Sequence, residues 1–168
     1  MKRGIYPGTF DPITFGHLDL VKRSVRIFDE VVIAVAPNPR KQPLFDLEER
    51  IALIRDSVEG MKQVSVEPFE GLLVDYARER GGVALIRGLR AVSDYEYELQ
   101  MTLMNRRLDR TIETVFMMPS EEYSFISSTI VKEVASFGGS VKSLVPPAVA
   151  AAIKKKFGAV KRTPGQKS

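Results

Sequence analysis

Short apolar runs rich in β-branched residues alternate along the chain with stretches in which apolar residues recur every three or four positions. The runs cover residues 5–6, 31–36, 64–66, 83–86 and 114–118, and the helical spacing fills the segments between them. Strands separated by helices pair in parallel, because parallel neighbours need long crossover connections. The alternation therefore predicts an α/β fold, a Rossmann-like doubly wound sheet of five parallel strands with helices on both faces.

The length of 168 residues is enough for one sizeable core and short for two. We predict a single domain over residues 1–157 and a basic, flexible tail over residues 158–168. The chain has no cysteine, which excludes disulfides, thiolate metal sites and a cysteine nucleophile. Its longest uncharged apolar run, residues 144–153, contains two prolines and falls short of the ~18 residues of a membrane span. The N-terminus has no long apolar signal region, so we expect a cytoplasmic protein without a membrane partner.

The formal net charge of +4 is unevenly distributed. Beyond Glu133 there are seven basic residues and no acidic one, whereas residues 1–133 carry 18 basic and 21 acidic side chains. The basic character therefore belongs to the C-terminal segment. Together with the absence of RNP-like and zinc-finger patterns, this distribution argues against the alternative of a nucleic-acid-binding module.

The loop after the first predicted strand, residues 6–17, is dense in residues that fix turns and expose backbone amides. Gly16 allows a close approach to the backbone, and His17 begins a helix whose N-terminus attracts anions. His17 is the only histidine in the chain. A lone histidine is more often structural, but its place after a glycine at a helix start favours phosphate binding.

Three further loops at strand ends carry cations or hydroxyl groups. Arg87 and Arg90 flank Gly88 after the fourth strand, where two guanidinium groups can hold phosphate oxygens. Lys41 follows the second strand and is either a solvated loop charge or a cation for a phosphoryl group. Hydroxyl groups follow the fifth strand at a predicted helix start, where one is enough for the cap: Ser127, Ser128 and Thr129. All four loops meet at one sheet edge, which predicts a polyphosphate site.

The predicted helix over residues 92–109 carries two apolar stripes. One runs through Tyr95, Leu99 and Leu103, and the other through Tyr97, Met101, Met104 and Leu108. Two apolar faces need two partners. One partner can be the sheet and the other a second subunit, or both stripes can form one broad core face.

Three segments resemble a known family: YPGTFDPITFGH at residues 6–17, IRGLRAVSDYEYE at 86–98 and SFISSTIVKEVA at 124–135. They are similar to the bacterial phosphopantetheine adenylyltransferases, of the nucleotidyltransferase superfamily related to class I aminoacyl-tRNA synthetases. The resemblance runs from about Gly4 to Leu144. TFGH corresponds to the superfamily's (T/H)xGH element, and ISSTIVK to its ISSTxxR element, with Lys132 in place of the arginine.

The resemblance implies a nucleotidyltransferase domain that transfers an adenylyl group from ATP to 4'-phosphopantetheine, giving dephospho-coenzyme A and pyrophosphate. It also implies Mg2+ without direct side-chain ligation, a homo-oligomer that is a hexamer, and feedback by coenzyme A at the pantetheine site. The catalytic residues would be Thr9, His17, Lys41 and Arg90. Those that bind ATP would be Gly8, Thr9, Phe10, His17, Arg87, Gly88, Arg90, Glu98, Tyr123, Ser127, Ser128 and Thr129. Those that bind phosphopantetheine would be Thr9, Lys41, Leu72, Leu73, Arg87 and Asn105, although the two leucines can equally be core positions.

The substrate phosphate is already an anion near neutral pH, so this chemistry needs no general base. The nearest alternative is another nucleotidyltransferase of the same fold, a cytidylyltransferase or an enzyme that acts on nicotinamide mononucleotide. TFGH is shared with these enzymes, and IRGLRAVSDYEYE favours the pantetheine enzyme.

Overall fold

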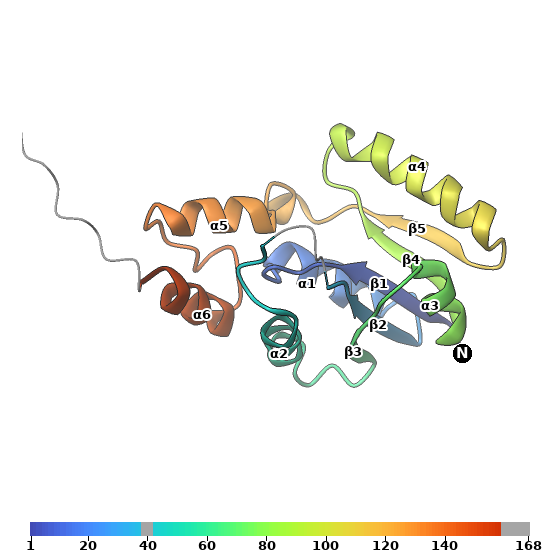
Figure 1. The fold of residues 1–168 in the computed structure, drawn as a ribbon, viewed down its shortest axis with the longest axis horizontal. Helices are drawn as coiled ribbons and strands as arrows, with labels where there is room; N and C mark the ends of the chain where they lie inside the picture. Colours follow the sequence, from blue (N-terminus) through green and yellow to red (C-terminus); the bar gives the residue numbers. More distant parts are fainter. Residues whose placement is uncertain (38–41, 159–168) are drawn as a thin grey trace, which may run out of the picture.

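The computed structural model describes residues 1–37 and 42–158 and forms one five-stranded parallel sheet with helices on both sides (Figure 1). The strand order is β3-β2-β1-β4-β5, as predicted for a doubly wound sheet. The elements in chain order are β1 (Arg3–Gly8), α1 (Phe15–Ser24), β2 (Glu30–Val35), α2 (Leu47–Ser57), β3 (Val64–Pro68), α3 (Leu73–Glu79), β4 (Gly82–Gly88), α4 (Val92–Leu108), β5 (Glu113–Met117), η1 (Glu121–Tyr123), α5 (Ser128–Ser136) and α6 (Pro147–Gly158).

Successive residues of a central strand face two different cores. In β2, Val31, Ile33 and Val35 belong to the core that lies under α1, α2, α5 and α6. Val32 and Ala34 belong to the smaller core under α3. Because both faces of the strand are covered, its sequence is a continuous apolar run and not an alternating one.

The helix starts follow from local capping. The side chain of Asp46 accepts from the Glu49 N–H at 2.8 Å, and the Glu49 carboxylate accepts from the Asp46 N–H at 3.0 Å. This reciprocal pair is the capping box that the sequence predicts. The final helix begins at Pro147, where a missing N–H costs nothing. Of the predicted tail, only Gly158 lies within the described residues, and it ends α6.

Helix α4 runs beside β5 at the far end of the sheet (Figure 1). Glu98 is the one buried side chain among those of α4 that the structure describes. Both predicted apolar stripes are exposed, so neither packs on the sheet, and the interpretation as one broad core face is wrong as well. The exposed apolar side chains are Tyr95, Tyr97, Leu99, Met101, Leu103, Met104 and Leu108.

Candidate active site

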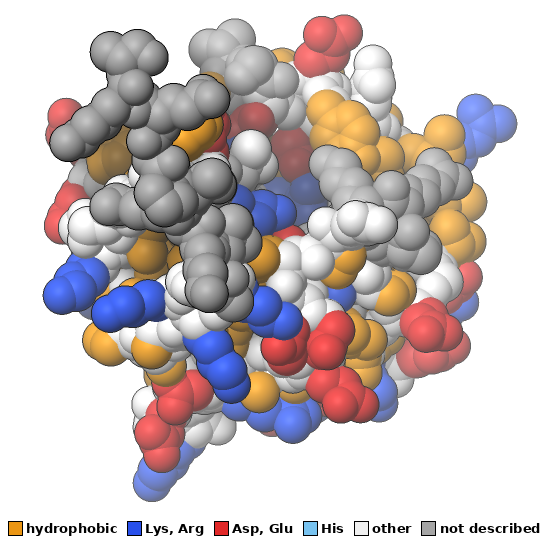
Figure 2. All heavy atoms as spheres, turned by 60° about the vertical axis from the view of Figure 1, so that its left-hand side comes forward, with side chains coloured by type: hydrophobic (Ala, Val, Ile, Leu, Met, Phe, Trp, Pro, Cys, Tyr) orange, Lys and Arg blue, Asp and Glu red, His pale blue; other side chains and the backbone are white. Residues whose placement is uncertain are grey.

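A cavity of about 390 Å³ lies between the carboxyl ends of β1 and β4. The strand order reverses between these strands, which is where open parallel sheets bind ligands. Figure 2 turns this edge toward the viewer and shows Lys and Arg side chains at a hollow in its middle. The lining includes all twelve residues that the sequence suggests for ATP: Gly8, Thr9, Phe10, His17, Arg87, Gly88, Arg90, Glu98, Tyr123, Ser127, Ser128 and Thr129.

The residues suggested for phosphopantetheine are placed differently. Thr9 and Arg87 line the cavity, but Leu72, Leu73 and Asn105 do not. Leu72 is exposed at the start of α3, Leu73 packs partly against the smaller core, and Asn105 lies on α4. Lys41 lies outside the described residues.

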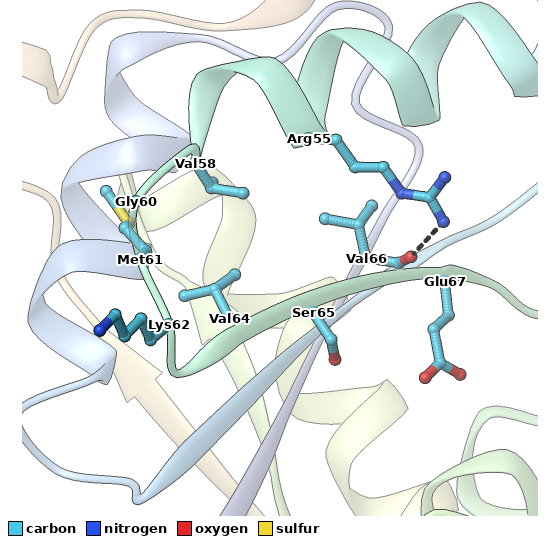
Figure 3. A pocket seen from close by; sticks show the side chains of 9 residues that line it. All are labelled: Arg55, Val58, Gly60, Met61, Lys62, Val64, Ser65, Val66 and Glu67. Carbon is cyan, nitrogen blue, oxygen red and sulfur yellow. Dashed lines mark hydrogen bonds between the residues drawn. The ribbon is translucent and has the colours of Figure 1, made fainter.

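A larger depression of about 560 Å³ lies at the β3 edge of the sheet (Figure 3). It is lined by residues from the end of α2 to β3, among which Arg55 donates to the Val66 carbonyl at 3.1 Å. None of the candidate site residues from the sequence analysis lines this depression. The cavity between β1 and β4 is therefore the candidate active site.

The first turn of α1 fixes the tautomer of His17. The backbone N–H of Thr14, the N-cap residue, donates to His17 Nδ1 at 3.0 Å. Nδ1 is therefore an acceptor, so in the neutral ring the proton is on Nε2. Burial, and to a smaller extent the nearby Arg90 cation, together lower the pKa of His17 to about 4. At neutral pH His17 presents an uncharged ring that donates through Nε2.

This low pKa predicts a pH dependence of stability. In the unfolded chain the imidazole returns to its ordinary pKa of about 6.5, so between pH 6.5 and pH 4 the unfolded state binds more protons than the folded state. Stability should therefore fall as the pH drops through this window, by on the order of 2 kcal/mol for this group. Chemical denaturation at pH 7 and pH 4.5 measures the loss. His17→Gln should lose less stability than the wild type, and equal losses would contradict the prediction.

The aromatic side chains around His17 explain the glycine at the end of β1. Phe10 has a φ of 48°, in the left-handed region that few non-glycine residues adopt. Its buried ring meets Tyr6 at 5.3 Å and His17 at 5.1 Å between ring centroids. A Cβ on Gly8 would lie 2.8 Å from the Phe10 ring, so a larger residue does not fit there.

Arg87 and Glu98 are paired with each other in this structure. Arg87 Nε donates to Glu98 Oε2 at 2.8 Å and Nη2 donates to Oε1 at 2.5 Å. Such two-point pairing holds both planar groups in fixed orientation. The sequence analysis treats the two side chains as separate contacts to ligands. The pair leaves Arg87 Nη1, which makes only a 3.4 Å contact with the Pro7 carbonyl, as the donor most readily available to a ligand.

Arg90 and the α5 start form the opposite wall. Arg90 Nη1 makes a long contact of 3.4 Å with the Ile126 carbonyl, and its Nε lies 3.4 Å from Asp94 Oδ2. Since both contacts are long and the side chain is 41% exposed, the guanidinium can turn toward an anion. Ser127 caps α5 by accepting from the Ile130 N–H at 3.1 Å. Ser128 Oγ donates to the Pro12 carbonyl at 2.7 Å, which ties α5 to the loop after β1. Two of the three hydroxyl groups thus have structural partners.

Asp11 and Lys132 were not predicted as site residues, and both line the cavity. Lys132 Nζ lies 2.9 Å from Asp11 Oδ2. The buried Asp11 carboxylate also accepts from the N–H groups of Leu44 and Phe45, each at 2.9 Å. Lys132 lies four residues after Ser128, one helical turn further along α5, so helical periodicity could have placed it at the site.

No helix within the described residues is long and apolar enough to cross a membrane.

The comparisons with known proteins agree on one family. Residues 5–134 match the model of the cytidylyltransferase-like family. The chain is 60% identical over 157 residues to the phosphopantetheine adenylyltransferase of Thermodesulfovibrio yellowstonii, covering 93% of this chain and 98% of that one. It is 54% identical over 156 residues to the enzyme of the same name from Alkaliphilus metalliredigens, covering 93% and 99%.

The fold is shared more widely than the sequence. A solved structure from Vibrio parahaemolyticus, described as a candidate nicotinate-nucleotide adenylyltransferase, superposes with a TM-score of 0.71 at 16% identity and covers 92% of this chain and 93% of its own. That likeness shows the Rossmann-like nucleotidyltransferase fold alone. The sequence relatives are closer and span nearly the whole chain, so the protein belongs to the phosphopantetheine adenylyltransferase family, within the cytidylyltransferase-like enzymes.

Proposed function

We propose that this protein transfers the adenylyl group of ATP to the phosphate of 4'-phosphopantetheine, forming dephospho-coenzyme A and releasing pyrophosphate. The observation that carries the proposal is the single cavity at the β1–β4 switch point, where His17, Arg90 and the N-terminus of α5 converge. Relatives named for this activity are 54–60% identical to the chain.

The cavity suits a reaction between two anions that needs no side-chain nucleophile. The carboxylates of Asp11 and Glu98 are held by cations, Lys132 and Arg87, and the ring of His17 is oriented by a backbone N–H. A phosphate monoester attacks as the anion it already is. The work left to the protein is to hold both phosphates in line and to stabilise the charge that develops on the α-phosphate and on the departing pyrophosphate.

Each wall of the cavity then has a role. His17 Nε2–H would donate to the α-phosphate, and Arg90 with the first amides of α5 would hold the β- and γ-phosphates. Thr9 and Lys41 would orient the phosphate of phosphopantetheine. Arg87 and Glu98 would exchange their mutual pairing for contacts with the substrates.

Mg2+ fits this site as a companion of the nucleotide. Within the described residues no three acidic or histidine side chains cluster to hold a metal ion, and both carboxylates at the cavity are already paired. Mg2+ usually keeps several waters and binds substrate phosphates, so the triphosphate itself would hold the ion. The ion would supply charge neutralisation on the phosphates, while Arg90 and the α5 amides position them.

The pantetheine arm would leave the cavity toward α3 and α4, where Leu72, Leu73 and Asn105 lie. Coenzyme A carries the same arm and would compete for this path. Copies of the chain would pack through the exposed apolar side chains of α4 into a homo-oligomer, a hexamer by resemblance to the family.

Pyrophosphate release is the direct test. Purified protein with Mg2+ and 4'-phosphopantetheine should release pyrophosphate with ATP at a kcat/KM at least tenfold above that with CTP. With nicotinamide mononucleotide in place of phosphopantetheine, release should fall to background. A preference for CTP or for nicotinamide mononucleotide would favour the corresponding nucleotidyltransferase instead.

A further inference from the structure

We propose that Arg50, buried in α2, is a positioning residue for the half of the active site that binds the phosphate of phosphopantetheine. This inference rests on the proposed function. Arg50 is 1% exposed, and no described carboxylate lies within 4 Å of its guanidinium. A buried cation without a carboxylate partner is rare and costly unless other acceptors surround it.

Backbone carbonyls take the place of that carboxylate. Arg50 Nη1 donates to the carbonyls of Thr9 at 2.7 Å and Ala36 at 2.8 Å, and Nη2 donates to Pro37 at 3.1 Å. Nε donates to the backbone carbonyl of Phe45 at 3.1 Å and more weakly to the backbone carbonyl of Asp46 at 3.3 Å. One side chain thus joins the loop after β1, the end of β2 and the start of α2.

These three segments belong to the same half of the cavity. Thr9 is suggested for the substrate phosphate as well as for ATP, and Gln42 and Pro43, just before Phe45, line the cavity. Arg50 holds the β2–α2 connection through hydrogen bonds to the carbonyls of two described residues, Pro37 and Phe45. Asp11 accepts from the N–H groups of Leu44 and Phe45 in the same connection, and its carboxylate and that of Asp46 stabilise the Arg50 charge at longer range.

The nucleotide half is held mainly by other contacts, although the Lys132–Asp11 pair links α5 to the loop after β1. His17 is oriented by Thr14, Arg90 contacts the Ile126 carbonyl, and α5 is tied to Pro12 through Ser128. None of these contacts involves Arg50. Displacing the Arg50 guanidinium should therefore loosen the substrate-phosphate half and leave the nucleotide half largely in place.

Lysine cannot reproduce this arrangement, although it keeps the charge. A guanidinium has five N–H groups in a planar fork, and here the fork reaches carbonyls on three segments. An ammonium has three donors on one atom at the end of a shorter side chain. Arg50→Lys should leave some of these buried carbonyls without a donor, and the segments that carry them should shift.

The test compares Arg50→Lys with Arg55→Lys, the same substitution on the same helix. Arg55 also donates to a backbone carbonyl, that of Val66 at the β3 edge, but it lies away from the active site (Figure 3). Steady-state kinetics should show that Arg50→Lys raises the KM for phosphopantetheine on the order of 30-fold and changes the KM for ATP less than about threefold. Arg55→Lys should keep both KM values within about twofold of the wild type.

A purely structural role for Arg50 makes a different prediction. It would lower the melting temperature or the active fraction and leave both KM values unchanged, or raise them equally. Either result, or an Arg50→Lys protein that fails to fold even with saturating ATP, would overturn the proposal. The wild-type assay keeps the two hypotheses apart, because a wild type without phosphopantetheine-dependent pyrophosphate release contradicts the proposed function, whatever the variants do.

Discussion

Replacing His17 by alanine should lower kcat by a factor on the order of 10² or more and leave the affinity for ATP nearly intact. The reason is that a neutral imidazole donor gains most when charge develops on the α-phosphate in the transition state, and little from the ground-state nucleotide. The fold should survive, because Thr14 Oγ1 still accepts from the backbone N–H of residue 17. Single-turnover rates and equilibrium ATP binding separate the two effects.

His17→Gln provides a graded control for this prediction. Its amide nitrogen can reach the region of Nε2 and donate, so it should recover part of the rate that alanine loses. An alanine variant with an unchanged kcat would remove His17 from the mechanism. A variant that loses ATP affinity in step with kcat would show that His17 binds the ground state equally well.

Placing a charge on the exposed face of α4 should break the proposed oligomer. Leu103 is 56% exposed, and the neighbouring apolar side chains of Leu99 and Met104 on α4 are exposed as well. Burying a carboxylate there against another copy costs several kcal/mol per interface, of which Arg106 or Arg107, one turn further along α4, can offset only a part. Light scattering should give the wild type a mass of six times the 18.8 kDa chain, and Leu103→Glu a much smaller one.

Ile27→Glu is the matched control for the oligomer. Ile27 is exposed to a similar degree, 55%, and lies in the turn after α1, away from α4. Its substitution should leave the mass unchanged. A Leu103→Glu protein with the wild-type mass would contradict the assignment of the α4 face to self-association.

The sequence predicts the sheet and the location of the site because both follow from local patterns. Val31–Val35 is apolar at every position since two cores cover β2, and this run identifies a buried parallel strand. Once the strands are parallel, the loops that carry His17, Arg90 and Ser128 must meet at one edge.

The partners of individual side chains could not be predicted in this way. The pairing of Arg87 with Glu98 depends on how α4 is rotated over the end of β4, which no local pattern determines. Arg50 has the sequence context of an exposed helix charge, between Glu49 and Ile51, and its burial is set by where three loops meet. The exposure of both α4 stripes likewise depends on tertiary packing, because either stripe could have covered the sheet.

The hydrogen bond from Thr14 to the one imidazole of the chain also makes the active site directly visible to magnetic resonance. A protein labelled with 15N in histidine has a single pair of ring nitrogens, both at the phosphate-binding edge. Because Nδ1 accepts a hydrogen bond and Nε2 carries the proton, their two 15N resonances are far apart and can be assigned directly to the two nitrogens. Titrating ATP and phosphopantetheine separately into this sample would report which substrate reaches Nε2, without any substitution in the protein.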